Sequence, residues 1–255
     1  MTRPYNLTIG WLYPDLMSTY GDRGNVIVLS KRAQWRGIEV VVKKISVAQP
    51  TEDLVDCDML FMGGAQDLQQ EIVTRDLESS KGANLIKLIE NNIPALFICG
   101  AYQFMGKYYK AADGTIIKGL SIFDLYTESP GESSPRMIGN ITVQPLLPGL
   151  KDKNLTFVGF ENHGGRTFIS DSQYAFGTVI NGFGNNGADK TEGIAWKNAI
   201  GTYLHGPILT KNPELADYMI EKAIEKKYGE KIELESIENV LESKAKDVII
   251  GKTGV

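Results

Sequence analysis

The chain has 255 residues, of which 42% are hydrophobic and 23% are charged, and its formal net charge is −4 at pH 7. This balance is typical of a globular protein with one large core and lacks the basic charge of a nucleic-acid-binding protein. No apolar run approaches the roughly 20 residues that cross a bilayer, and the first residues, MTRPYNLTIG, lack the apolar core of a signal peptide. We therefore expect a cytoplasmic protein that does not insert into a membrane.

The first hundred residues alternate between strand-like and helix-like segments. Residues 38–45 are rich in β-branched side chains, and the runs MLFM (59–62) and ALFI (95–98) are typical of strands buried on both faces. Strands are expected at 6–13, 38–45, 57–64 and 94–99, and helices at 24–37 and over much of 68–89. This order predicts an α/β fold with a mostly parallel sheet covered by helices.

The second half of the chain follows a different pattern. Residues 115–203 are rich in glycine, with short strand candidates that predict further strands, some of them antiparallel. The segment 212–229 predicts a helix with Asn212 as its N-cap residue and Pro213 at its first position. A last amphipathic segment places Ile237, Val240, Leu241 and Val248 on one face, for which we favour core packing over docking. We expect one domain, residues 1–255, with a C-terminal helical extension at about 230–255.

The stretch ALFICGAYQFMG, residues 95–106, places Cys99 between a buried strand and a short helix. A nucleophile at such a turn is held with its reactive atom exposed, and the N-terminus of the following helix favours the thiolate. The backbone N–H groups of Gly100 and of Gly64, in the preceding strand exit, are candidate oxyanion donors. Cys99 is thus either a nucleophile or a buried structural cysteine, whereas Cys57 is read as a small core residue.

A thiolate nucleophile needs a basic partner, and the chain has only two histidines, His163 and His205. Each follows a strand-like run, so the spacing alone does not choose between them. Two cysteines are too few for a disulfide framework or a cysteine-based zinc site, and no metal site is predicted.

The motif ICGAYQFMG resembles the nucleophile loop of the class I, or triad-type, glutamine amidotransferases, in the branch that contains cobyric acid synthase. The resemblance implies a flavodoxin-like, three-layer α/β fold. It also implies Cys99 as nucleophile, His205 as base, and an oxyanion hole from Gly64 and Gly100. Gln103 matches a family glutamine that touches the bound substrate, L-glutamine.

Four motifs in order resemble more narrowly the GatD family of glutaminase subunits: YGDRGN (20–25), FMGGAQD (61–67), FENHGGRT (160–167) and GTYLHGPIL (201–209). The resemblance implies a heterodimer with a MurT-like synthetase subunit that uses ATP and Mg, while this chain carries no cofactor. The pair would amidate the α-carboxylate of D-glutamate in the stem peptide of lipid II, reached through the partner. The GKT at 251–253 is no P-loop, because Lys246 replaces its first glycine.

The chain departs from the class I pattern at Pro207, where members usually carry the glutamate that orients the histidine. Glu161 and Asp217 are the candidates for a replacement. Arg136 resembles a GatD arginine and is the candidate clamp for the substrate carboxylate, because a guanidinium matches a carboxylate with two parallel hydrogen bonds.

Three other features stay open at this stage. Arg166 is a second candidate clamp, and His163 either contacts substrate or partner or is a histidine in a glycine turn. The loop Tyr20–Asn25 is read as a structural or docking loop rather than an anion site.

Two rival functions also remain. One is a stand-alone cysteine hydrolase such as a γ-glutamyl hydrolase, and the other is a non-catalytic binding subunit.

Overall fold

A six-stranded sheet lies at the centre of the computed structural model, which describes residues 5–47, 49–65 and 67–253. The strand order is β13-β14-β4-β3-β1-β2, and every pairing is parallel except that of β13 with β14. The strands are β1 (Asn6–Leu12), β2 (Glu39–Ile45), β3 (Met59–Met62), β4 (Ala95–Ile98), β13 (Ile194–Trp196) and β14 (Ala199–Thr202). The predicted mostly parallel sheet is confirmed.

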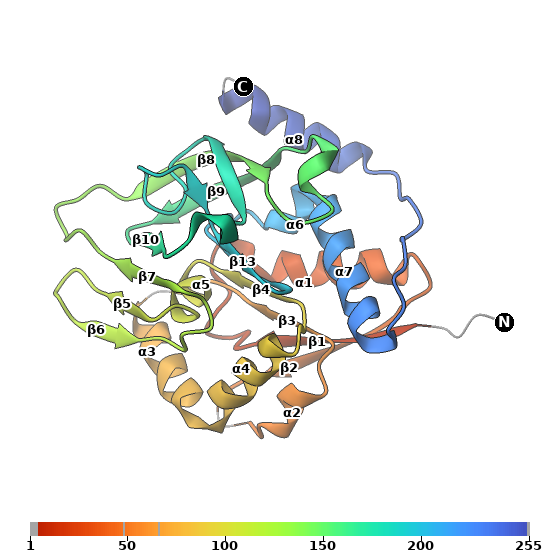
Figure 1. Ribbon diagram of the computed structural model, residues 1–255, viewed down its shortest axis with the longest axis horizontal. Coiled ribbons are helices and arrows are strands. Elements are labelled where there is room, and N and C mark those ends of the chain that lie inside the picture. The colour runs from red at the N-terminus through yellow and green to blue at the C-terminus, as the bar shows by residue number, and fades with distance from the viewer. Residues whose placement is uncertain (1–4, 48, 66, 254–255) are drawn as a thin grey trace.

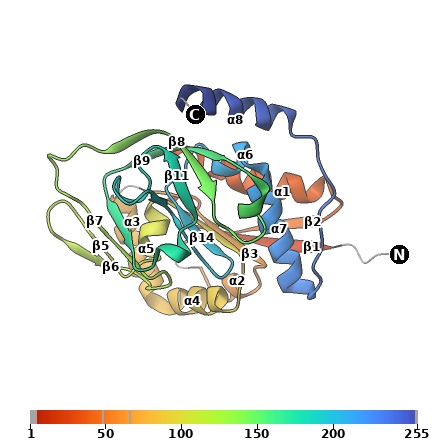
Figure 2. The same cartoon turned by 45° about the horizontal axis from the view of Figure 1, so that its top comes forward.

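Helices cover both faces of this sheet and complete a three-layer fold (Figure 1; Figure 2). On one face lie α1 (Arg23–Gln34), α6 (Ile208–Lys211) and α7 (Pro213–Tyr228); on the other lie α2 (Glu52–Val55), α3 (Asp67–Asp76) and α4 (Gly82–Glu90). A π-helical turn, η2 (Leu77–Lys81), joins α3 to α4.

Alternation along β1 explains why the sheet has two apolar faces. Leu7 and Ile9 pack in the core cluster that contains Leu29 of α1, whereas Leu12 belongs to the cluster that contains Leu85 of α4.

Two smaller sheets occupy the glycine-rich middle of the chain, in the orders β10-β7-β5-β6 and β12-β11-β8-β9. All of their pairings are antiparallel except that of β5 with β7, as predicted for a region with antiparallel strands. Their strands are β5 (Tyr108–Lys110), β6 (Ile116–Lys118), β7 (Leu125–Glu128), β8 (Met137–Pro145), β9 (Phe157–His163), β10 (Arg166–Ile169), β11 (Gly177–Asn181) and β12 (Thr191–Glu192).

The start of α7 differs from its prediction in one respect. Pro213 is the first helical residue as expected, but the Asn212 side chain makes no capping hydrogen bond. It instead accepts from the Val158 N–H at 2.9 Å and donates to the Val158 carbonyl at 2.8 Å. Asn212 therefore ties the helix start to β9 rather than capping the helix.

The C-terminal helix α8 (Val240–Thr253) begins later than the predicted extension and has no buried residue. Leu241 is 78% exposed and Val248 is 55% exposed, so the expectation that this apolar face packs into the core is wrong. Lys246 of α8 pairs with Glu214 of α7 at 3.2 Å. No helix within the described ranges is both long and apolar enough to span a bilayer.

Candidate active site

Four neighbouring parallel strands end at one edge of the central sheet, where ligands of such folds bind. The exits of β1, β3, β4 and β14 lead to Asp22, Gly64, Cys99 and His205 respectively. The pairing of β4 with β14 brings Ile98 opposite Thr202, so the chain reaches Cys99 and His205 side by side. Gln66, in the loop predicted to face Cys99, lies outside the described residues.

Cys99 adopts a backbone conformation that few side chains tolerate, with φ 52° and ψ −106°. It occupies the turn between β4 and the short helix α5 (Gly100–Phe104), and its N–H donates to the Thr202 carbonyl at 2.9 Å. The side chain is partly exposed and lines a cavity of about 760 Å³. A strained turn that presents one side chain to a cavity is the geometry of a nucleophile elbow.

His205 is buried and lies against an acid that the sequence analysis did not assign to it. Its Nδ1 donates to Oδ1 of Asp22 at 3.2 Å, and Asp22 is itself fully buried. The backbone of His205 is fixed by an antiparallel bridge to Phe160. Burial lowers the pKa of His205, but Asp22 and the Cys99 thiol together raise it to about 10. Nε2 makes no well-formed hydrogen bond to any described residue.

Neither carboxylate predicted to orient the histidine does so. Asp217 of α7 instead pairs with Arg32 of α1 at 2.7 Å and with Arg36, just after α1, at 2.9 Å, and both arginine side chains are buried in this contact. Glu161 accepts the backbone N–H groups of Phe183 and Gly184. Both predictions are wrong because other donors already hold these oxygens.

Asp22 belongs to the YGDRGN motif, for which the sequence predicts a structural or docking loop. The residue occupies the N-cap position of α1, yet its side chain makes no capping bond, because the carboxylate turns toward His205. The helix start reaches this place because Gly24 packs on the ring of Pro207, with no room for a Cβ. In the sequence, an aspartate that precedes a helix but contacts a distant histidine cannot be told apart from one that caps the helix.

The Gly64 N–H does not have the orientation predicted for an oxyanion donor. It donates to Oδ2 of Asp22 at 2.8 Å and so helps to hold the carboxylate that contacts His205. Gly100 is the first residue of α5, where an N–H has no acceptor within the helix. The Gly64 prediction is corrected, and Gly100 stays the candidate donor.

The cavity beside Cys99 contains two of the predicted substrate-binding residues. Gln103 is buried, and its Nε2 donates to the Tyr203 hydroxyl at 3.0 Å. Arg136 is exposed at the cavity and donates to Oδ1 and to the carbonyl of Asn162. Arg166 binds the carbonyls of Gly164 and Pro135 instead.

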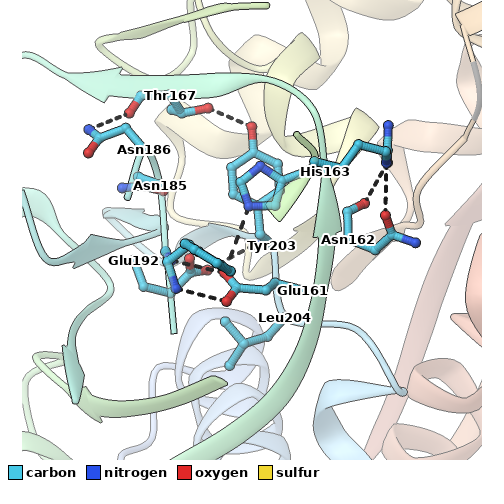
Figure 3. A network of polar contacts seen from close by, with 12 residues as sticks. Glu161, Asn162, His163, Thr167, Asn185, Asn186, Glu192, Tyr203 and Leu204 are labelled. Atoms are coloured by element: carbon cyan, nitrogen blue, oxygen red, sulfur yellow. Dashed lines mark hydrogen bonds and ion pairs between the residues drawn. The ribbon is translucent and has the colours of Figure 1, made fainter. Parts of the chain in front are cut away.

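His163 lies in a separate buried cluster (Figure 3). Its ring stacks on Tyr203 at 3.6 Å, and its Nδ1 donates to the Gly165 carbonyl at 2.8 Å. Nε2 is 3.9 Å from Oε2 of Glu161, beyond hydrogen-bonding distance, and burial lowers the pKa of His163. Nearby Glu192 is fully buried, and that burial raises its pKa to about 7.

This second cluster is the back wall of the cavity. His163 lines the cavity and stacks on Tyr203, whose hydroxyl accepts from Gln103. The structure thus brings the predicted pair of Cys99 and His205 together and places His163 in the wall. In the ranges 5–47, 49–65 and 67–253, no three His, Cys, Asp or Glu side chains are grouped so as to hold a metal ion.

Comparison with known proteins finds relatives over almost the whole chain. Residues 8–213 match the profile of the CobB/CobQ-like glutamine amidotransferase domain. The chain is 44% identical to a Staphylococcus aureus protein described as lipid II isoglutaminyl synthase (glutamine-hydrolyzing) subunit GatD, over 97% of this chain and 96% of that protein. The Streptococcus pneumoniae protein of the same description is 40% identical, over 93% and 88%.

More distant matches agree with this family. A probable cobyric acid synthase from Methanosarcina barkeri is 31% identical over 72% of this chain, but the match spans 36% of that longer protein. Among solved structures, PurLQS from Thermotoga maritima superposes with a TM-score of 0.50 at 12% identity, over 88% of this chain and 97% of that chain. At that identity the likeness concerns the fold alone.

Proposed function

The chain belongs to the CobB/CobQ-like glutamine amidotransferase family, and from this premise we propose that it is the glutamine-hydrolysing subunit of a lipid II isoglutaminyl synthase. Two relatives with that description match nearly the full length of the chain. The family match at residues 8–213 includes Asp22, Cys99 and His205. The observation that carries the proposal is the contact between the His205 ring and the buried Asp22 carboxylate, next to a nucleophile elbow.

The reaction begins with attack of the Cys99 thiolate on the side-chain amide carbon of L-glutamine. The C–N bond breaks as His205 gives a proton to the departing nitrogen. The nitrogen leaves as ammonia, and the γ-glutamyl group remains on Cys99 as a thioester. His205 then takes a proton from water, whose oxygen attacks the thioester carbon; the C–S bond breaks, which releases glutamate and regenerates the Cys99 thiolate. Two easier steps through a covalent intermediate replace one difficult amide hydrolysis.

Asp22 takes the orienting role that the missing glutamate has in other class I members. Its hydrogen bond to Nδ1 fixes the tautomer, so that Nε2 faces the reacting atoms, and it stabilises the imidazolium that forms during the reaction. Catalytic hydrogen bonds are often long in a structure without substrate, so the absence of a short bond from Nε2 to the thiol is compatible with this role.

Substrate specificity would come from the cavity. Arg136 offers a guanidinium for the α-carboxylate of glutamine, and Gln103 lines the same cavity. The Gly100 N–H stabilises the oxyanion of the tetrahedral intermediates.

Ammonia has to reach a second subunit for amidation. We propose a MurT-like, ATP- and Mg-dependent ligase as the partner in a cytoplasmic heterodimer, with lipid II bound by that partner and no cofactor in this chain. The mention of a subunit in the descriptions of both relatives supports an assembly of this kind.

A diazoketone analogue of glutamine tests the chemistry directly. We expect mass addition at the peptide that contains Cys99, and none in Cys99→Ala. Equal labelling of both proteins would rule out Cys99 as the nucleophile.

Ammonia release by wild type, Cys99→Ser and His205→Ala, with and without the ligase, separates the rival functions. Partner-free peptide cleavage would support a hydrolase. Equal rates for wild type and Cys99→Ser would support a non-catalytic subunit.

A further inference from the structure

Asn162 of β9 contacts both Arg136 and Tyr20 at the cavity. It precedes His163 on β9, and Figure 3 shows its side chain directed away from the buried cluster of Glu161, His163 and Tyr203. It lines the cavity that contains Cys99. A strand alternates its side chains between two sides, so Asn162 lies on the opposite side of β9 from Glu161 and His163.

Asn162 occupies one edge of the Arg136 guanidinium. Its Oδ1 accepts from Nε at 3.0 Å, and its carbonyl oxygen accepts from Nη2 at 2.9 Å. A guanidinium has five N–H groups on a planar fork, so the other edge, formed by Nη1 and Nη2, remains available. A Cβ on Gly164 would lie 3.4 Å from Nη1, which places this edge over the Gly164–Gly165 turn in the cavity wall. Two N–H groups on one edge match a carboxylate.

The same amide also holds Tyr20. Asn162 Nδ2 donates to the Tyr20 hydroxyl at 2.9 Å, and the Tyr20 ring meets His205 edge-on at 5.0 Å between centroids. Tyr20 has a left-handed backbone, with φ 54° and ψ 26°, two residues before Asp22. Because Arg136 can only donate, the amide oxygen must face it, and the amide nitrogen must face Tyr20. One side chain therefore fixes both the clamp and the ring beside His205.

We propose that Asn162 is a positioning residue for substrate recognition. It presents the free edge of Arg136 to the α-carboxylate of the substrate and holds Tyr20 at the cavity beside His205. This inference rests on the proposed glutaminase function, since it takes the α-carboxylate of an amino-acid substrate as the ligand of Arg136.

The test compares two reagents that react with Cys99 in the full chain. The diazoketone analogue of glutamine has an α-carboxylate, whereas iodoacetamide has none. We expect Asn162→Ala to raise the diazoketone KI about tenfold, with its maximal rate of inactivation and the iodoacetamide rate changed by less than about twofold. Tyr20→Phe, which loses only the hydroxyl, should raise KI about threefold.

Two further variants separate positioning from folding. Asn198→Ala removes a similar exposed bond, to the Asn92 carbonyl, at the other end of the sheet and should leave KI unchanged. In an Arg136→Ala background, Asn162→Ala should change KI by no more than about threefold, because only the part of its effect that passes through Tyr20 remains once Arg136 is removed.

Three results would overturn the inference while wild type is still labelled: an unchanged KI in Asn162→Ala, an equal loss with iodoacetamide, or full additivity with Arg136→Ala. Wild type that does not react with the diazoketone at Cys99 would instead overturn the proposed function together with this inference.

Discussion

The two histidines of the chain both lie buried beside a carboxylate, yet their surroundings act in opposite directions. Asp22 accepts a hydrogen bond from Nδ1 of His205, and the pKa of that ring is raised to about 10. Glu161 is 3.9 Å from Nε2 of His163, and the pKa of His163 is lowered by burial. The hydrogen bond to Asp22, together with the Cys99 thiol, outweighs burial in the first pair, and burial outweighs the more distant carboxylate in the second.

The comparison explains how one histidine can be catalytic and the other structural. The Glu161 carboxylate is held by two backbone N–H groups, while the His163 ring is held by Tyr203 and Gly165. His205 contacts Asp22 through one nitrogen, and its second nitrogen makes no well-formed hydrogen bond within the described residues. The neighbours of each ring distinguish the two sites, whereas both sequence motifs simply place a histidine after a strand.

Replacing each histidine separately with alanine should give the largest difference in kcat between two variants. We expect His205→Ala to lower kcat for glutamine hydrolysis by about 10³-fold or more, because proton transfer and thiolate stabilisation are both lost. His163→Ala should lower kcat by less than about tenfold and mainly raise KM, since the ring supports the cavity wall. Steady-state ammonia release measures both. Equal losses in kcat would contradict the division of roles.

Loss of the Asp22 charge should have the next largest effect. Asp22→Asn keeps the size of the side chain but no longer favours the imidazolium, so we expect kcat to fall about 10²-fold. Glu161→Gln is the matched control, and its kcat should change far less. A variant Asp22→Asn with wild-type kcat would show that His205 needs no acid.

Asp22 also shows which part of the site cannot be predicted from the sequence. The central sheet, the turn at Cys99 and the histidine after the last parallel strand follow from local apolar runs and chain order. The contact between Asp22 and His205 spans 183 residues and depends on the packing of Gly24 against Pro207. The exposure of the apolar face of α8 also depends on long-range packing. Periodicity identifies an amphipathic helix, but it does not say what covers the apolar face.

Glu192 should make stability depend on pH. Its pKa is 4.5 ordinarily and about 7 here, so its stabilising contribution is complete below pH 4.5 and is lost as the pH rises through 7. Glu192→Gln keeps an acceptor for Thr202 and Tyr203 and removes this dependence. Between pH 4.5 and 8 the variant should lose roughly 3 kcal/mol less unfolding free energy than wild type. Urea unfolding at both pH values measures this, and parallel losses would contradict it.

A change in the packing of Gly24 against Pro207, next to Asp22, should have the smallest effect on stability and kcat. In Gly24→Ala the new methyl group collides with the Pro207 ring, so α1 has to shift. We expect a loss of about 1–3 kcal/mol in unfolding free energy and a lower kcat, because Asp22 moves with the helix start. Gly37→Ala is a useful contrast, since that glycine has a positive φ and open space around it; its variant should lose stability but keep kcat. A Gly24→Ala protein with full activity would contradict the coupling.

NMR titration of the two histidines tests the central claim most directly, because the chain has only these two and His163→Ala assigns them. In wild type, one ring should titrate near pH 10 and the other below its ordinary value of 6.5. Asp22→Asn should lower the pKa of the first ring and leave the second unchanged. If both rings titrate near 6.5, or if Asp22→Asn moves neither, then Asp22 and His205 do not act as the catalytic pair.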